Sequence, residues 1–372
     1  MGATQSQLQL HKQNHFERSI SNIFNEAKIL SLNGLSTIVD SVSFVTVNST
    51  SQTGSVLICD DGSLHFFCNE TLEILYSTKL RTSKFINIQK FGVDSLILVS
   101  DKNVIFVAKL NEDGFAVSEF NIEHPAFAVD INSNETFAVV DNTCNTFLCN
   151  TTDLSIRCLW KDISNNKPNS IVFGEINDEK FIAISADKLI LGYIKEGEKP
   201  VFHDVEPSCI MRFFDDEIYC LSEPKKKLFV ITLMSDLSIQ FTETIYNGIS
   251  ICDVELVDDK TIVGCNLNNI FAYNDNLLNI SLNLETSTNK IMKFNSRIFL
   301  VFCKNGTIIV CRVENQQNDI EYRILKNIHQ SEIQTFCKVS DFSFLTVDIN
   351  NHVVLWESLD DWWDAPFYSS SF

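Results

Sequence analysis

The residue types that most often carry covalent or metal chemistry are present in this chain, but their spacing is not that of a reactive site. The seven histidines are scattered, and His65 and His124 fall on or before predicted strands without clustered partners. Paired carboxylates such as Asp60 and Asp61 fall in predicted turns, where aspartate is common because it hydrogen-bonds its own backbone. The sequence contains no G-x-S-x-G, Walker-type, H-E-x-x-H or glycine-rich phosphate-binding motif. We therefore predict no catalytic residue, no cofactor site, no metal site and no enzymatic activity.

Twelve cysteines could form disulfides or bind zinc, but no two of them are spaced as C-x-x-C. Most lie among valine, isoleucine and phenylalanine, as Cys59, Cys303 and Cys311 do. A free cysteine in such a segment behaves as a small apolar residue. We therefore expect most of the cysteines to be buried and structural.

The chain of 372 residues has 29 basic and 48 acidic side chains, which give a formal net charge of −19. Such a charge repels polyphosphate backbones and anionic lipid surfaces, so nucleic acid and bare membranes are poor first partners. The hydrophobic share of 45% and the charged share of 21% are those of an ordinary globular protein. No apolar run approaches the roughly 18 residues of a membrane span, and the N-terminus lacks a signal-peptide core. These features predict a soluble, cytoplasmic protein whose partners are other proteins.

Both ends of the chain contain candidate modification or binding residues. Residues 1–6 fit the M-G-x-x-x-[ST] pattern, so Gly2 is a candidate acylation site. A single acyl chain with few basic residues nearby would give weak membrane contact. The acidic C-terminal tail, residues 359–372, could bind a partner through its aromatic side chains, although we favour a role in capping the folded domain. These aromatic residues are Trp362, Trp363, Phe367 and Tyr368.

A repeat of about forty residues organises the predicted strands. Each unit has one apolar run followed by a hairpin of two more, joined by a turn of aspartate, asparagine or glycine. The clearest hairpins are residues 56–67, with Asp61-Gly62 in the turn, and residues 299–310, with Asn305-Gly306. The eight first strands span 290 residues over seven intervals, or about 41 residues per unit. They begin near Val42, Phe85, Ala126, Ser170, Cys209, Ile249, Lys290 and Glu332.

Units of this length with four short strands predict an all-β fold, a β-propeller of seven or eight four-stranded blades, with eight favoured. A β-sandwich is the alternative, but its irregular crossovers do not give an even repeat. The last unit lacks a fourth strand, and an N-terminal strand at residues 27–32 could supply it and close the ring. The predicted parts are an N-terminal segment (1–26), the propeller (27–358) and the tail (359–372). A helix is expected only around residues 21–28.

The last unit resembles a WD repeat. In that family a histidine before the first strand, a serine or threonine on the second, an aspartate in the turn and a tryptophan on the third form a buried hydrogen-bonded set. The corresponding residues here are His329, Thr346, Asn350 and Trp356. Asn350 departs from the pattern, and an amide lacks the charge that strengthens a hydrogen bond to histidine. The resemblance implies that these residues stabilise the fold and do no catalysis. The other units lack the tryptophan, so the propeller is divergent.

The N-terminal segment is similar to the G-Q-T-P-x-Q-L…P-H-P-x-R segment that closes the BEACH domain in BEACH-domain proteins, just before their WD-repeat propeller. The proline positions of that pattern are not kept, whereas Gly2, Thr4, Gln7, Leu8, His15 and Arg18 match. The resemblance implies a non-enzymatic interaction scaffold in membrane or vesicle trafficking, in contact with membranes through partner proteins. Two alternatives stay open: another WD-repeat adaptor, such as a ubiquitin-ligase substrate receptor or coat subunit, or a hydrolase that uses the propeller channel.

Overall fold

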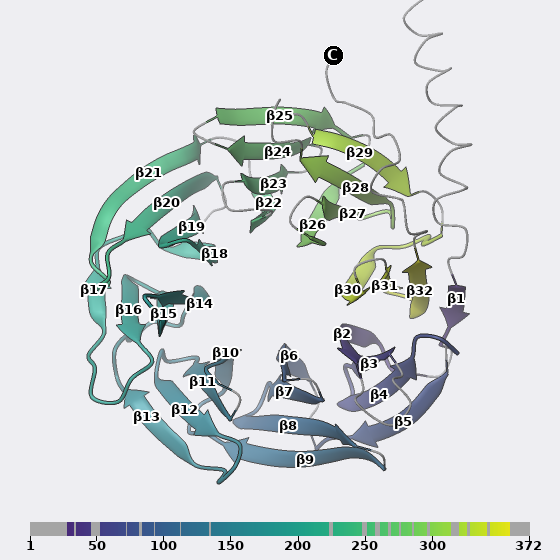
Figure 1. The fold of residues 1–372 in the computed structure, drawn as a ribbon, viewed down its shortest axis with the longest axis horizontal. Coiled ribbons are helices and arrows are strands. Elements are labelled where there is room, and N and C mark those ends of the chain that lie inside the picture. The colour runs from purple at the N-terminus through teal and green to yellow at the C-terminus, as the bar shows by residue number, and fades with distance from the viewer. Residues whose placement is uncertain are drawn as a thin grey trace, which may run out of the picture.

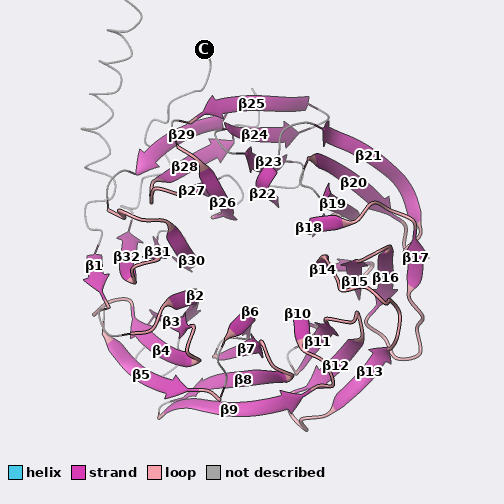
Figure 2. Cartoon of the chain, turned by 180° about the vertical axis from the view of Figure 1, so that it is seen from behind, coloured by secondary structure: helices cyan, strands magenta, loops and turns pink. Residues whose placement is uncertain are grey.

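The structure is a computed structural model in which 32 β-strands form eight four-stranded antiparallel sheets. It describes residues 28–357, except for 33–34, 46–52, 72, 82–83, 93, 112, 134, 223–225, 248–250, 257–260, 267–268, 275–276, 285, 296–297, 314–319, 326–327 and 341–342. The sheets are arranged as blades around a central opening, and strands are the only regular elements in the described part (Figures 1 and 2). The prediction of an eight-bladed propeller is therefore confirmed. The helix expected around residues 21–28 lies outside the described residues, except that Lys28 begins a strand.

Each blade is numbered here by the position of its innermost strand in the sequence. Blade 1 consists of β2 (Ile38–Val45), β3 (Thr53–Cys59), β4 (Ser63–Cys68) and β5 (Ile74–Lys79), and blade 2 of β6 (Phe85–Phe91), β7 (Ser95–Ser100), β8 (Val104–Asn111) and β9 (Gly114–Asn121). Blade 3 consists of β10 (Ala126–Ile131), β11 (Thr136–Asp141), β12 (Thr146–Asn150) and β13 (Ile156–Trp160), and blade 4 of β14 (Ser170–Ile176), β15 (Glu179–Ser185), β16 (Leu189–Tyr193) and β17 (Val201–His203).

The remaining blades repeat this order until the last one, which takes its outer strand from the N-terminus. Blades 5 to 8 are made of β18 (Ser208–Phe214), β19 (Glu217–Ser222), β20 (Lys227–Leu233) and β21 (Ile239–Asn247); β22 (Ile251–Leu256), β23 (Thr261–Asn266), β24 (Asn269–Asn274) and β25 (Leu277–Asn283); β26 (Thr288–Lys293), β27 (Ile298–Cys303), β28 (Ile308–Val313) and β29 (Ile320–Leu325); and β30 (Ile333–Ser340), β31 (Ser343–Asp348), β32 (His352–Glu357) and β1 (Lys28–Ser31).

The second strand of a blade is an almost continuous apolar run because both of its faces are covered by neighbouring blades. In β7 (Ser95–Ser100), for example, all six residues are buried. The innermost strands are half-buried, and in every blade except blade 4 a β-bulge lies near the start of this strand. A bulge increases the local twist of a strand, which suits the crowded inner edge of the ring.

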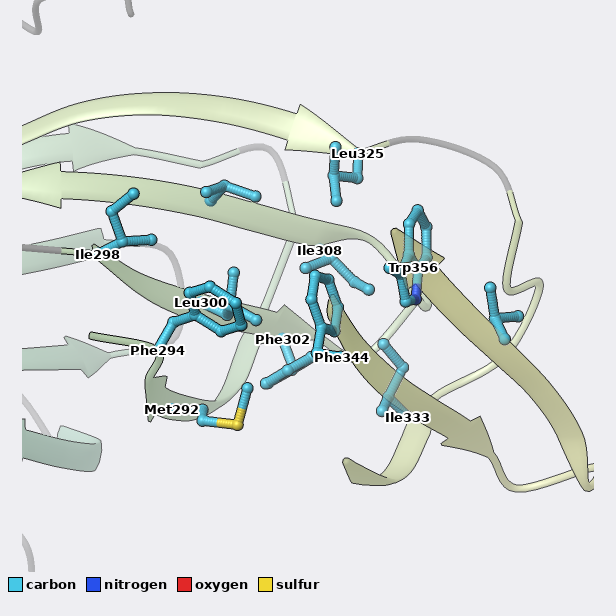
Figure 3. Packing of buried hydrophobic residues seen from close by; sticks show 12 residues of the cluster. Met292, Phe294, Ile298, Leu300, Phe302, Ile308, Leu325, Ile333, Phe344 and Trp356 are labelled. Carbon is cyan, nitrogen blue, oxygen red and sulfur yellow. The ribbon is translucent and has the colours of Figure 1, made fainter. Parts of the chain in front are cut away.

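The hydrophobic core is divided into eight clusters, one at each seam between neighbouring blades. The cluster between blades 7 and 8 is drawn in Figure 3, where Phe344 and Trp356 from blade 8 lie against Ile308 from blade 7. The rings of Phe344 and Trp356 are stacked, with centroids 5.7 Å apart. Each blade therefore buries both of its apolar faces only when it contacts two neighbours, and opening the ring at one seam would expose the apolar residues of that seam.

The ring is closed by β1, which pairs antiparallel with β32 over Lys28↔Leu355 to Ser31↔His352 (Figure 1, where β1 is purple). The predicted closure by an N-terminal strand is confirmed. Asn351 connects the two ends of the ring further, because its Oδ1 accepts the Ile38 N–H at 2.9 Å. Its Nδ2 donates to the carbonyl of Ser36 at 3.1 Å. Blade 8 is therefore linked both to β1 and to the segment that leads into blade 1.

The antiparallel order places the turns at two opposite faces of the ring. We call the face that contains the turns between first and second strands and between third and fourth strands the acidic face. The other face, which we call the mixed face, contains the turns between second and third strands and the linkers between blades. The two predicted glycine turns, at Gly62 and Gly306, lie on the mixed face with φ of 85° and 83°. Three residues separate the two strands at Gly62 and four separate them at Gly306, and glycine takes the left-handed position in each turn.

Candidate functional site

The predicted WD-type residues meet in blade 8, with one substitution in the set. His329 lies in the linker before β30, Thr346 on β31 and Trp356 on β32, and all three are buried. His329 Nε2 lies 2.7 Å from Thr346 Oγ1, and the Trp356 indole N–H donates to the same oxygen at 2.8 Å. His329 Nδ1 lies 3.3 Å from the Asp348 carboxylate. One proton arrangement satisfies every group: Nδ1–H donates to Asp348, and the Thr346 hydroxyl donates to Nε2.

The acidic member of the set is Asp348, so the assignment of Asn350 to this position was wrong. The Asn350 amide instead donates to Ser331 Oγ at 3.0 Å in an exposed contact. Asp348 is the last residue of β31 and is fully buried, and its Oδ1 accepts the backbone N–H groups of Asn350 and His352 at 2.9 and 3.0 Å. The Asp348 carboxylate therefore fixes the backbone of the turn and also binds His329. It can do both because it lies at the end of the strand, buried below the turn.

A sequence signal for Asp348 exists in another blade. Asp141 ends the second strand of blade 3, is fully buried, and accepts the backbone N–H groups of Thr143 and Asn145 at 2.8 and 2.9 Å. The left-handed residues Cys144 and Asn351, with φ of 63° and 60°, follow these two aspartates at the same spacing. An alignment of the blades on the last residue of the second strand would have selected Asp348 in place of Asn350.

The titration properties of the set fit a structural role. Burial lowers the pKa of His329 and outweighs its hydrogen bond to Asp348, so the imidazole is neutral near pH 7. Burial also acts to raise the pKa of Asp348, but hydrogen bonds from His352, Ser331 and Asn350 outweigh it and hold the pKa below its usual value. The side chains of His329 and Asp348 are fully buried, so no substrate can reach them in this conformation.

A second group of polar residues, which the sequence reasoning did not single out, lies on the innermost strands and links neighbouring blades. Thr335 of blade 8 donates to Asp40 of blade 1 at 2.9 Å. Arg212 of blade 5 lies 3.9 Å from Asp253 and 3.7 Å from Glu255 of blade 6. Burial raises the pKa of Asp40 and of Glu255 despite these contacts. The contacts indicate that these carboxyl groups hold the inner ring together.

The two faces of the ring differ in charge. Among the described residues outside strands, the turns of the acidic face contain twelve carboxylates and two lysines, and the loops of the mixed face contain nine carboxylates and eight basic residues. The acidic-face residues are Glu70, Glu73, Asp94, Asp113, Glu135, Asp153, Asp178, Lys195, Glu196, Glu198, Lys199, Asp215, Asp216 and Asp236. The mixed-face residues are Asp60, Asp61, Arg81, Lys84, Asp101, Lys102, Glu123, Lys161, Asp162, Lys167, Asp187, Lys188, Asp204, Glu206, Lys226, Lys304 and Glu332.

The acidic face contains a cavity of about 330 Å³ where blades 3, 4 and 5 meet. Its walls come from the ends of three innermost strands, the start of β15 and the neighbouring turns. A second hollow of about 240 Å³ shares Glu175, Lys180 and Ile194 with it and extends to the outer turn of blade 4. The cavity is lined by Asp130, Ile131, Phe173, Gly174, Glu175, Lys180, Ile194, Phe213, Phe214 and Asp215.

The remaining predicted site residues, Gly2, Trp362, Trp363, Phe367 and Tyr368, lie outside the described residues. Within the described ranges, no three histidine, cysteine, aspartate or glutamate side chains cluster as metal ligands would. The same part of the chain has no helix that is long and apolar enough to cross a membrane. All twelve cysteines are free, and nine of them are buried, as expected. The paired aspartates Asp215 and Asp216 occupy left-handed turn positions, with φ of 47° and 64°, which explains the residue type there without acid–base chemistry.

The chain was compared with known proteins and solved structures. No protein-family model and no curated protein sequence matches it. The C-terminal WD40 domain of Sif2 matches with a TM-score of 0.65 and 12% sequence identity, over 89% of this chain and 98% of that chain. Saccharomyces cerevisiae Sqt1 matches with a TM-score of 0.69 and 10% identity, over 91% of this chain and all of that chain. The chain therefore has the fold of a WD40-type β-propeller, and its resemblance to BEACH-domain proteins rests on the N-terminal residues alone.

Proposed function

We propose that this protein is a non-catalytic scaffold that binds other proteins, and that its acidic face is the main binding surface. The observation that carries this proposal is the unequal charge of the two faces: among the described residues outside strands, one face has twelve carboxylates against two lysines and the other is near balance. Charge gathered on one side of a rigid body attracts and orients a basic partner, which raises the rate of association. The cavity lies on this same face.

The architecture supports a scaffold because the residues that stabilise the ring are different from those that form the proposed binding surface. The seam clusters and the inner hydrogen bonds hold the ring, whereas the charged side chains of the acidic-face turns lie outside these clusters, on loops of the kind that usually tolerate changes in sequence. The His329 set in blade 8 is closed off from solvent and stabilises the blade. A partner can therefore bind the turns without disturbing the residues that keep the ring closed.

The proposal is tested by reversing charge on each face in turn. One variant carries Glu70→Lys, Glu135→Lys and Glu198→Lys, which are exposed carboxylates in turns of the acidic face with ordinary backbone φ. Its matched control carries the same charge change at Asp60, Asp101 and Asp187 on the mixed face. Quantitative affinity capture from cells should lose partners with the first variant and keep them with the second, while both retain the wild-type circular dichroism spectrum. Equal losses, or no loss, would contradict binding through the acidic face.

Within this role we place the protein in membrane or vesicle trafficking, in the cytoplasm and at membranes through its partners. The support is the resemblance of residues 2–18 to the segment that precedes the propeller in BEACH-domain proteins. Fluorescence microscopy of the chain tagged at its C-terminus, which leaves Gly2 free, should show vesicle-associated signal. A uniform cytoplasmic signal would favour a ubiquitin-ligase receptor or another adaptor over a trafficking role.

A propeller hydrolase is the alternative from another class. It would require an acid and a base that converge on one accessible point. The inner carboxyl groups Asp40, Asp253 and Glu255 each accept a hydrogen bond or face a cation from the next blade, which supports a structural role for them. A hydrolase screen with wild type and Glu255→Gln tests this: activity that disappears in the variant would replace the scaffold by an enzyme.

A further inference from the structure

The cavity where blades 3, 4 and 5 meet combines aromatic walls with acidic groups. Phe173 and Phe213 come from the innermost strands of blades 4 and 5, Asp130 from that of blade 3, and Asp215 from the turn that follows β18. Its volume of about 330 Å³ is at the small end of the range for ligand sites, roughly 300–1,000 Å³. This size suits one long side chain with its adjoining backbone better than a large cofactor.

The aromatic wall is held in place before any ligand binds. The Phe213 ring meets the Phe181 ring edge-on, with centroids 4.9 Å apart, and Phe181 is fully buried. Gly174 leaves the space for this arrangement, because a Cβ there would lie 2.4 Å from Phe181 and 2.5 Å from Phe213. A ring whose position is set by such packing offers its surface to a ligand without a further loss of side-chain entropy.

The charges of the cavity are only partly compensated. Within the described part of the chain, Glu175 and Asp215 form no ion pair. The Asp130 carboxylate accepts its neighbour's backbone N–H and a hydrogen bond from Gln89 at 3.2 Å. Lys180 lines the same cavity, but its ammonium donates to the Ile131 carbonyl at 2.9 Å. Burial raises the pKa of Asp130 although the charge of Lys180 acts to lower it, so a further cation that enters would stabilise the carboxylate beyond what Lys180 provides.

The second hollow prolongs the cavity along blade 4 toward its outer edge. It adds Asp178 and Glu179, and Lys195, whose ammonium lies 3.2 Å from the Glu179 carboxylate. The two hollows together are lined by five carboxylates and two lysines. A surface that is hollowed from the inner strands to the outer turn, and acidic along this length, matches an extended basic polypeptide better than a small isolated cation.

We propose that this pair of hollows binds a basic polypeptide segment of a partner protein and that an arginine side chain of the segment occupies the cavity at Phe213. Arginine fits better than lysine because its planar guanidinium stacks on an aromatic ring and can hydrogen-bond two carboxylates at once. Arginine buried in a pocket is also a frequent hot spot of protein interfaces. This inference rests on the proposed scaffold function and names its partner class.

The test uses the full chain and a fluorescein-labelled glycine–serine peptide with one central arginine between two lysines. Matched peptides carry lysine or citrulline at the centre, and citrulline keeps the shape of arginine but removes its charge. Fluorescence anisotropy should show the arginine peptide binding about tenfold more tightly than the citrulline peptide. Equal affinities for these two peptides would overturn the proposal.

Protein variants locate the binding. Asp215→Asn preserves the left-handed turn, since asparagine tolerates positive φ, and should weaken arginine-peptide binding by about five- to tenfold. Asp113→Asn is the matched control, because Asp113 is an exposed carboxylate on the acidic face in blade 2, away from the cavity. This control should change the affinity by less than about twofold. A loss in the control as large as that in Asp215→Asn would show diffuse charge attraction and would contradict the arginine site.

Two further outcomes separate this inference from the scaffold proposal. In the first outcome, the variant with reversed charges on the acidic face loses its cellular partners, while Asp215→Asn binds the arginine peptide as tightly as wild type does. The scaffold proposal then holds, and the cavity is not the arginine site. If agmatine, a small guanidinium compound, displaces the peptide at concentrations near the peptide's own dissociation constant, the hollows bind a small cation and the polypeptide is the wrong occupant.

Discussion

Replacing Asp348 by alanine should destabilise the propeller much more than the same replacement at Asn350, two residues further along the turn. The Asp348 carboxylate is fully buried and accepts hydrogen bonds from His329, from the backbone N–H of Asn350, and from both the backbone and the ring of His352. The Asn350 amide donates one hydrogen bond to Ser331 in an exposed position. The pair of variants therefore compares a buried acceptor with an exposed donor in the same turn.

The expected magnitude follows from the partners left behind. Without Asp348, the buried Nδ1–H of His329 has lost its acceptor, which costs about 1–3 kcal/mol. The backbone N–H groups of Asn350 and His352 are closer to water, and each lost bond costs about 0.5–1.5 kcal/mol. The free energy of unfolding should therefore fall by about 2–6 kcal/mol, in the range of the large losses seen when a buried hydrogen-bond network is broken. Asn350→Ala should lower it by no more than about 0.5 kcal/mol.

Urea denaturation of the full chain measures both values, and tryptophan fluorescence is a suitable probe because Trp356 is buried beside Phe344 in the same blade. Asp348→Asn serves as an intermediate variant, since it keeps an acceptor oxygen for the turn but loses the charge. Its midpoint should lie between those of wild type and Asp348→Ala. Two results would refute the reasoning: an Asn350→Ala midpoint as low as that of Asp348→Ala, or a change below about 1 kcal/mol for Asp348→Ala.

Four further predictions can be checked in the same way. Asn351→Ala should lower the free energy of unfolding by about 2–3 kcal/mol, because it removes the acceptor of the Ile38 N–H and places alanine at a φ of 60°. Asn351→Gly should lower it less, because glycine adopts this φ without strain. Equal urea midpoints for the two variants would contradict the strain argument. Gly264→Ala should lower the free energy of unfolding, measured by urea titration, by about 1–3 kcal/mol, because a Cβ at this position would lie 2.1 Å from the Phe271 ring. This is the opposite of the usual effect, since replacing glycine by alanine within a strand ordinarily stabilises it. The free energy of unfolding should fall as the pH drops below about 6.5, because burial lowers the pKa of His329 in the folded protein and the unfolded chain therefore binds the proton first. The difference in unfolding free energy between wild type and His329→Gln should shrink over this pH range. A difference that stays constant with pH would show that His329 does not titrate in this way. Thiol labelling of the native protein should modify Cys158 first, since it is the one exposed cysteine. Buried thiols such as Cys220, whose pKa burial raises to about 12, should react only after unfolding. Equal labelling rates for Cys158 and Cys220, mapped by mass spectrometry, would contradict the closed seams.

The sequence was informative where a local pattern repeats in every blade. The first strands, the glycine turns at Gly62 and Gly306, and the use of residues 27–32 to complete blade 8 were all predicted. It was less reliable where a single position had to be chosen within a turn, as the exchange of Asn350 for Asp348 shows. Both residues are polar, with Asp348 at the end of the strand and Asn350 within the turn. They differ in burial, which a residue type alone does not reveal.

The amino-acid sequence by itself determined the blade, because the alternation of apolar runs and turn residues acts over a few residues and recurs every forty or so. The tertiary structure decided what lies side by side between blades. Asp130, Glu175 and Asp215 are far apart in the chain, and the ring brings them together beside Phe213 at one cavity. It also sorts the turns onto two faces, so that a net charge spread along the sequence becomes one acidic face and one mixed face. The candidate binding site is therefore a product of the packing of neighbouring blades, since no single blade contains it.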